Sequence, residues 1–154
     1  MFTTTPFSAW ELNDNLLAGL ESIGWEFATQ VQKETIPLAL SSKDVIGQAR
    51  TGSGKTAAFG LPTMNSCQPT GELQALILAP TRELANQVAE ELSNIQGNTG
   101  LNIQTVYGGT DLEKQAKNLQ AGVDIIVGTP GRVMDMTERA VSYTHLTLPT
   151  NGCV

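Results

Sequence analysis

Residues Asp44–Thr56 read DVIGQARTGSGKT, a short apolar run that leads directly into a loop of small residues. The run Asp44–Gln48 predicts a buried strand, and the residues after the loop predict a helix. Ala49–Thr56 fit the pattern of a phosphate-binding loop, with alanine in place of the first glycine. Such a loop between a strand and a helix indicates a nucleoside triphosphate site in an α/β fold.

The residue types in this loop match the chemistry of a phosphate group. Gly52 and Gly54 allow the backbone to wrap around a phosphate with its N–H groups pointing inward. Lys55 brings a positive charge to the β- and γ-phosphates, and the Thr56 hydroxyl is a ligand for Mg²⁺. The alternative is a glycine-rich turn that happens to precede a helix. The predicted nucleotide ligands in the loop are Ala49, Thr51, Gly52, Ser53, Gly54, Lys55 and Thr56.

Three further apolar runs predict strands at Gln74–Ala79, Asn102–Tyr107 and Asp124–Gly128. Helical patterns fill the gaps between the runs, most clearly after Thr81 and after Thr110. Short apolar runs without alternation are typical of strands buried on both faces, and strand–helix alternation requires right-handed crossovers. The fold class is therefore α/β, a parallel sheet with helices on both faces.

Two helices are predicted before the first strand, over roughly Asn13–Ser22 and Gln30–Leu40. At the start of the second, Thr29 and Gln32 have the spacing of a capping box. The Gln32 amide also offers one donor and one acceptor side by side, which match N6 and N7 of adenine and would refuse guanine. The spacing alone leaves both interpretations open.

Three loops follow the predicted strands, and each contains a glycine, an arginine or the start of a predicted helix. They are Pro80–Ala85, Gly108-Gly109 and Thr129–Arg132. Thr129 and Pro130 are a favourable N-cap and first-turn pair, and Gly108-Gly109 is by default a turn. Helix N-termini and arginines also bind anions, and ligands collect at the carboxyl ends of parallel strands. One edge of the sheet is therefore expected to hold a triphosphate site and several phosphate contacts.

Composition limits the classes of protein that remain. The chain has 154 residues, a net charge of −6, 40% hydrophobic residues and 16% charged residues. This is too apolar for a disordered chain, and no apolar run approaches the ~20 residues of a membrane helix. The cysteines, Cys67 and Cys153, have no metal-ligand spacing and make a poor disulfide framework. We expect a cytoplasmic protein without a membrane partner.

Taken together, these segments resemble the N-terminal part of a DEAD-box ATP-dependent RNA helicase, from about Phe7 to Arg139. Gly24–Gln32 resembles the family's glutamine motif, and Ala49–Thr56 its motif I. Pro80–Ala85, Gly108-Gly109 and Thr129–Arg132 resemble motif Ia, the glycine pair and motif Ib. The resemblance implies a phosphate-loop ATPase fold, the first of two RecA-like domains, with ATP and Mg²⁺ as cofactors and RNA as partner.

The resemblance also implies a role for each matching residue. Thr29 and Gln32 would recognise adenine, and Phe7 would pack against the base. Lys55 and Thr56 would assist catalysis, with Thr56 on Mg²⁺. The residues expected along the RNA backbone are Pro80, Thr81, Arg82, Gly108, Gly109, Thr129, Pro130, Gly131 and Arg132.

The sequence departs from the family pattern in several places. Ala28 and Gln30 stand where proline is usual, and Trp25 where Phe or Tyr is commoner. No Asp-Glu-Ala-Asp follows the Thr129–Arg132 segment, and the uncharged stretch from about Val141 has no periodicity. We therefore expect an N-terminal helical segment (1–42), an incomplete RecA-like domain (43–140) and an anomalous, non-native tail (141–154).

Without the acidic motif and an arginine finger, this polypeptide is predicted to hydrolyse ATP negligibly on its own. One alternative is a non-catalytic fragment that binds adenine nucleotide or RNA. Another is a different phosphate-loop ATPase, such as a DNA helicase, which Gln32 and Pro80–Ala85 disfavour.

Overall fold

The computed structural model describes residues 1–140, and the chain divides into two compact units. The first, called here the loop unit, consists of Met1–Ser66 and Glu91–Gly100. The second, called here the sheet unit, consists of Cys67–Glu90 and the residues from Leu101 onward. Helix α4 (Arg82–Ile95) contributes residues to both. The tail predicted to be anomalous lies outside the described residues.

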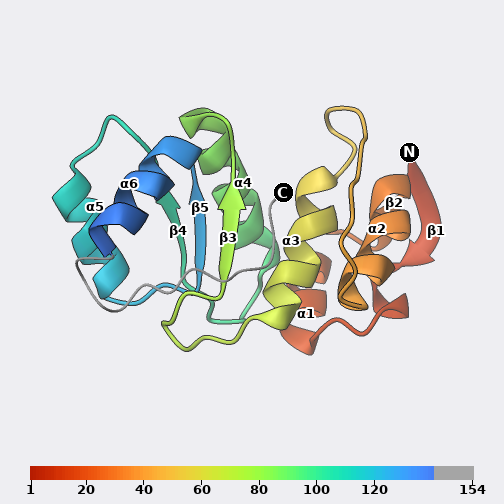
Figure 1. Cartoon of the computed structure of the whole chain (residues 1–154). Coiled ribbons are helices and arrows are strands. Elements are labelled where there is room, and N and C mark those ends of the chain that lie inside the picture. The colour runs from red at the N-terminus through yellow and green to blue at the C-terminus, as the bar shows by residue number, and fades with distance from the viewer. Residues whose placement is uncertain (141–154) are drawn as a thin grey trace. The chain divides into compact units, whose positions relative to one another are not determined.

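The sheet unit is built on three parallel strands, β3 (Ala75–Leu78), β4 (Ile103–Val106) and β5 (Ile125–Gly128), in the order β3-β5-β4 (Figure 1). Helices α5 (Leu112–Gln120) and α6 (Pro130–Ala140) complete it, with the first part of α4. These strands and helices confirm the predicted parallel α/β arrangement.

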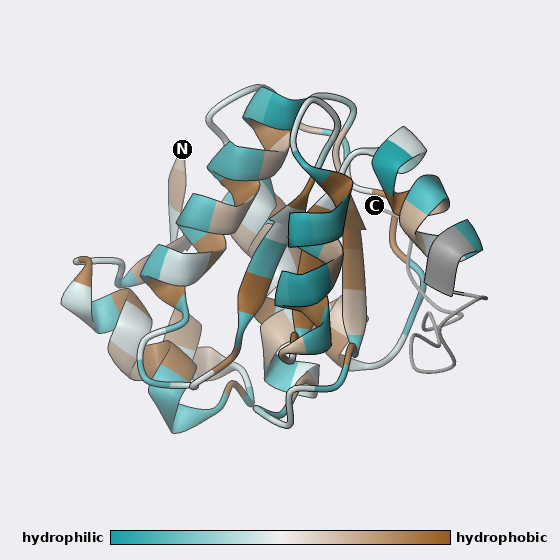
Figure 2. Cartoon of the chain, turned by 90° about the vertical axis from the view of Figure 1, so that its left-hand side faces the viewer, coloured by the Kyte–Doolittle hydropathy of each residue, from teal (hydrophilic) through white to brown (hydrophobic). Residues whose placement is uncertain are grey.

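Both faces of the central strand β5 are buried. Ile126 joins a cluster with Leu119 of α5 and Val133 of α6 on one face. Successive side chains of a strand point to opposite faces, and Ile125 and Val127 are also fully buried. This explains why the β5 run shows no apolar–polar alternation. On the helices, hydrophilic and hydrophobic bands alternate (Figure 2).

The loop unit contains a two-stranded antiparallel ribbon of β1 (Phe2–Pro6) and β2 (Phe27–Thr29). The short 3-10 helix η1 (Phe7–Ala9) directly follows β1. Its helices are α1 (Asp14–Ser22), α2 (Gln30–Leu40) and α3 (Lys55–Ser66). The two helices predicted in this region are confirmed, and the Asn13 side chain caps α1. The ribbon was not predicted, although the three threonines after Phe2 are typical strand residues.

The strand predicted over Asp44–Gln48 is wrong for this structure. Residues 43–50 follow an irregular path, and the Ile46 side chain is fully exposed, at 101%. A strand exists only where a neighbour takes up its backbone N–H and C=O groups. Among residues 1–140, the parallel sheet consists of β3, β4 and β5 alone, and this apolar run is paired with none of them.

Candidate functional site

The predicted phosphate loop leads from this irregular segment into the first turn of α3. Gly52 and Gly54 have positive φ angles of 75° and 85°, a region that other residues rarely adopt. Helix α3 begins at Lys55, so the glycines lie directly before its N-terminus. Thr51 and Gly52 are exposed, while Ser53, Gly54, Lys55 and Thr56 are half-buried. A glycine-rich turn before a helix N-terminus is the geometry that binds phosphate.

The Lys55 ammonium is held by its own loop. Its Nζ donates to the carbonyl oxygen of Ala49 and, at 2.9 Å, to that of Arg50. Two of the three N–H donors of the ammonium therefore point at backbone carbonyls. One N–H donor is left for a phosphate, and a phosphate that takes more than one must compete with these two contacts.

Gln32 links the start of α2 to the phosphate loop. Its side chain is 2% exposed, and its Oε1 accepts from the Thr29 backbone N–H at 2.9 Å. Its Nε2 donates to the carbonyl oxygen of Gly54 at 3.0 Å. The Gln32 half of the predicted capping box is confirmed, because the Gln32 side chain accepts from the backbone N–H of the N-cap residue Thr29. The second contact means that a ligand drawing on the Gln32 amide would also act on the phosphate loop.

Two buried hydroxyl oxygens in the loop unit, Thr29 Oγ1 and Ser53 Oγ, have no hydrogen-bond partner among the described residues. Both residues line a pocket of about 400 Å³, a volume within the usual ligand-binding range of roughly 300–1,000 Å³. Unsatisfied buried polar groups are costly, and a polar ligand in this pocket could supply the partners that these two hydroxyls lack.

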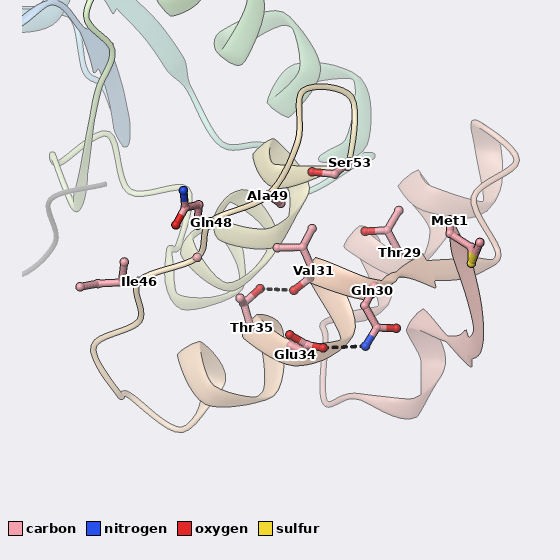
Figure 3. A pocket seen from close by; sticks show the side chains of 11 residues that line it. Met1, Thr29, Gln30, Val31, Glu34, Thr35, Ile46, Gln48, Ala49 and Ser53 are labelled. Atoms are coloured by element: carbon pink, nitrogen blue, oxygen red, sulfur yellow. Dashed lines mark hydrogen bonds between the residues drawn. The ribbon is translucent and has the colours of Figure 1, made fainter.

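Figure 3 shows this pocket between the first turns of α2 and the segment that carries Gln48 and Ala49. The Gln30 Nε2 donates to Glu34 Oε1 at 2.6 Å beside it. Phe7 is not among the lining residues: it is buried, at 3% exposed, with its ring edge against Trp10 at a centroid distance of 5.9 Å. Of the residues predicted to bind nucleotide, Thr29, Ala49 and Ser53 therefore line the pocket.

In the sheet unit, the loops after the three strands come together. The Arg82 guanidinium lies over the Tyr107 ring, 4.7 Å from its centroid. Gly109 has a positive φ of 83°, and a Cβ placed there would lie 3.9 Å from Arg82 Nη1. The structure thus brings the first turn of α4 close to the glycine pair, as predicted from the convergence of parallel strand ends.

Arg132, in the first turn of α6, contacts the same loop. Its Nη1 and Nη2 each donate to the Thr110 carbonyl oxygen at 3.2 Å. Nη1 also donates to Gln115 Oε1 at 3.1 Å. Tyr107, Thr110 and Gln115 were missed by sequence reasoning, because a single polar residue on an amphipathic helix or after a strand has no distinctive spacing.

The remaining predicted residues form the helix starts around this cluster. The Thr81 hydroxyl accepts from the Leu84 backbone N–H at 3.2 Å, and α6 begins at Pro130. The Thr129 backbone N–H donates to the Val106 carbonyl at 2.9 Å, which ties α6 to the end of β4. The exposed members of the set are Pro80, Thr81, Arg82, Gly108, Gly109, Pro130 and Gly131.

No three His, Cys, Asp or Glu side chains among residues 1–140 are grouped as ligands for a metal ion. None of the helices described there combines the length and apolar character needed to cross a membrane.

Comparison with known proteins places these features in a family. Residues 29–148 match a family model described as DEAD/DEAH box helicase. The RNA helicase CrhR of Synechocystis is 50% identical over 136 residues, which cover 88% of this chain and 28% of the relative. The DEAD-box ATP-dependent RNA helicase CshA of Streptococcus pneumoniae is 51% identical over 134 residues, covering 86% of this chain and 26% of the relative.

Solved structures agree. A DEAD box protein from Methanococcus jannaschii superposes with a TM-score of 0.84 at 39% identity, over 96% of this chain and 39% of that one. A hypothetical ATP-dependent RNA helicase from Sulfolobus tokodaii gives a TM-score of 0.74 at 37% identity, over 84% and 38%. The chain spans only about a quarter of the length of the curated relatives described above.

Proposed function

The chain belongs to the DEAD/DEAH box helicase family, and on that premise we propose that it works as part of an ATP-dependent RNA helicase. In this proposal the loop unit binds ATP and the sheet unit binds the RNA backbone. ATP binding and hydrolysis then drive the separation of RNA strands or the remodelling of RNA–protein complexes. The observation that supports the proposed ATP site is the pair of hydrogen bonds that the Gln32 side chain makes to Thr29 and Gly54.

Adenine selectivity is proposed to come from Gln32. The Gln32 amide has a second N–H and a second lone pair beyond the contacts described, and these match adenine but not guanine. Because Nε2 also holds the Gly54 carbonyl, base recognition would be coupled to the shape of the phosphate loop. Phe7 is proposed to pack against the base, which requires its ring, 3% exposed in this structure, to become accessible.

The phosphates are proposed to bind Ala49–Thr56, with Lys55 moving from the loop carbonyls to the β- and γ-phosphates. Mg²⁺ prefers oxygen ligands and keeps contacts to substrate phosphates, so the Thr56 hydroxyl fits as one ligand. The bound ion would neutralise charge that develops on the phosphates.

RNA is proposed to run along Pro80–Arg82, Gly108-Gly109 and Thr129–Arg132. Backbone N–H groups at helix starts and arginine side chains are the groups that contact phosphates without reading sequence. Arg82 and Arg132 lie in the first turns of α4 and α6, the helices that follow β3 and β5 at the carboxyl edge of the sheet. The overall negative charge does not oppose this proposal, because a few well-placed contacts are sufficient.

The chain alone is proposed to be catalytically inactive. An arginine finger accounts for roughly 10³–10⁵ in rate, and the second RecA-like domain that would supply it is proposed to belong to the longer protein. A cytoplasmic location is part of the same proposal. Purified chain that hydrolyses ATP well above background when RNA is added would refute the proposed inactivity. Nucleotide or RNA binding without turnover would support a non-catalytic fragment.

The test of the ATP site is a comparison of ATP and GTP binding by calorimetry, before and after Gln32→Ala. We expect the unaltered chain to prefer ATP and the variant to lose the preference. Gln87→Ala removes an exposed glutamine of α4 and serves as the matched control. Unchanged discrimination in Gln32→Ala would leave Gln32 with its capping role alone.

A further inference from the structure

We propose that Gln115 is a positioning residue for RNA binding, which fixes Arg132 directly and Arg82 through Tyr107. The proposal rests on the RNA-binding function proposed above for the sheet unit. It concerns a residue outside the segments that resemble the family's RNA-binding motifs.

The Gln115 side chain connects α5, on which it lies, to the loop after β4 and to α6. Its Nε2 donates to the Tyr107 carbonyl oxygen at 3.3 Å and to Thr110 Oγ1. Its Oε1 accepts from Arg132 Nη1 at 3.1 Å. Both N–H donors of the amide are therefore used by the loop after β4, and the oxygen is used by α6. A half-buried amide with these partners has one orientation that satisfies them all.

Two N–H donors of the Arg132 guanidinium are not used by the hydrogen bonds described. A guanidinium carries five N–H groups, and the described residues accept three bonds from Arg132, two from Nη1 and one from Nη2. The second N–H of Nη2 and the Nε–H remain for a phosphate oxygen pair. Because Gln115 and Thr110 already hold the guanidinium, less side-chain freedom is lost when RNA binds.

Arg82 is held less directly. Its guanidinium lies on the Tyr107 ring, and the backbone carbonyl of the same Tyr107 accepts from Gln115. One amide thus influences the positions of two cations that lie on different helices. Contacts to an RNA backbone depend on the spacing between cations, since the covalent linkage limits the distance between successive phosphates. Loss of Gln115 should weaken RNA binding even though Gln115 need not touch RNA.

The first experiment measures binding of a fluorescent single-stranded oligouridylate to the chain by anisotropy. Gln115→Met keeps the length of the side chain and removes all three hydrogen bonds. We expect the Kd to rise about tenfold, the size of one lost charge-assisted contact. In an Arg132→Ala background the same substitution should change the Kd by less than about twofold, because the cation it positions is absent. Gln120→Met, an exposed glutamine of the same helix, is the matched control.

A second variant tests the proposal in case Gln115→Met does not fold. Gln115→Glu keeps an oxygen for Arg132 but places a carboxylate against its guanidinium, so Arg132 pairs with protein rather than phosphate. The slope of log Kd against log salt concentration should fall by about one, as for removal of one phosphate contact. Gln120→Glu adds the same charge on the same helix and should change the slope much less.

The outcomes separate the two proposals. If the unaltered chain does not bind the oligouridylate, the proposed RNA-binding function fails and this inference fails with it. If Arg82→Ala and Arg132→Ala weaken binding but Gln115→Met does not, the positioning role alone is wrong. If Gln115→Met weakens binding equally with and without Arg132, its effect is a general structural one and the inference is overturned. If Gln115→Met fails to fold, an unchanged salt slope in Gln115→Glu overturns it.

Discussion

Lys55 in the loop unit and Arg132 in the sheet unit are both cations that donate to backbone carbonyl oxygens, but they are held differently. Lys55 donates to Ala49 and Arg50 of the loop that it is proposed to serve. Arg132 donates to Thr110 and Gln115, which belong to a different segment, and keeps two N–H donors beyond the bonds described. The lysine has one N–H donor left and must exchange partners to give a phosphate more, whereas the arginine has two donors for a phosphate where it is.

The difference follows the strands that support each loop. In the sheet unit, β3 and β4 both pair with β5, and Ala75 and Ile103 both lie opposite Ile125. The three strands are therefore in register, and the loops at their ends converge. In the loop unit, residues 43–50 before the phosphate loop are irregular. Paired strands fix where a loop begins, and a loop without a paired strand depends on local contacts such as those of Lys55 and Gln32.

The largest effect that we expect concerns the other end of the sheet. Asp124 is 1% exposed, and its carboxylate accepts from the backbone N–H groups of Thr70, Gly71 and Asn102 at 2.7–3.0 Å. These donors precede β3 and β4, and Asp124 itself precedes β5, so one side chain ties the starts of all three strands. Asp124→Ala should lower the free energy of unfolding by on the order of 4 kcal/mol, because several buried donors lose their acceptor. Urea denaturation measures this change.

Hydrogen exchange would locate the loss. If the carboxylate anchors the sheet, amides of β3 and β5 should lose protection while those of α2 and α3 keep theirs. Asp135→Ala, at an exposed position of α6, should change stability by less than about 0.5 kcal/mol. An equally small effect of Asp124→Ala would mean that strand pairing, and not this carboxylate, holds the sheet unit together.

The next largest effect tests the exchange of partners by Lys55. Lys55→Ala should weaken ATP binding at least about a hundredfold, or roughly 3 kcal/mol, because the charge proposed for the β- and γ-phosphates is lost. Oligouridylate binding should remain within about twofold. Calorimetry with ATP and anisotropy with RNA give the two values, and Lys43→Ala, at an exposed lysine in the same unit, is the control. Retained ATP affinity in Lys55→Ala would contradict the phosphate-loop assignment.

The same contrast explains what the sequence could predict. Helices over Gln30–Leu40 and after Thr81 follow from periodicity and capping residues, which are local properties. The Asp44–Gln48 run has the composition of a strand, but whether it pairs depends on residues elsewhere in the sheet. Local composition could therefore predict the β5 strand and fail for this run.

Within the candidate site, the loops with glycines and arginines were predicted because parallel strand ends meet at one edge. The role inferred for Gln115 was not predictable in this way. Its partners, Tyr107, Thr110 and Arg132, are brought together only by the crossover geometry of β4, α5 and α6. No pattern in a single sequence marks such a residue.

A smaller effect distinguishes the two glycines of the phosphate loop. A Cβ at Gly54 would lie 2.4 Å from Gln32 Nε2, whereas one at Gly52 would have nothing within 4 Å. Both have positive φ, so each alanine costs about 1–2 kcal/mol of backbone strain. Only Gly54→Ala should also displace the Gln32 amide and reduce the preference for ATP over GTP. Equal nucleotide preference in the two variants would show that Gln32 does not connect base recognition to the loop.

The smallest expected effect lies in the sheet unit, at the contact between Arg82 and Tyr107. A cation over an aromatic ring at an exposed site contributes about 0.5–1 kcal/mol, and Arg82 is exposed. Tyr107→Leu should therefore weaken oligouridylate binding about two- to fivefold, while Tyr107→Phe, which keeps the ring, should bind like the unaltered chain. Neither substitution changes the Tyr107 backbone carbonyl that accepts from Gln115. If Tyr107→Phe weakens binding as much as Tyr107→Leu, the hydroxyl matters and the ring contact does not hold Arg82 in place for RNA.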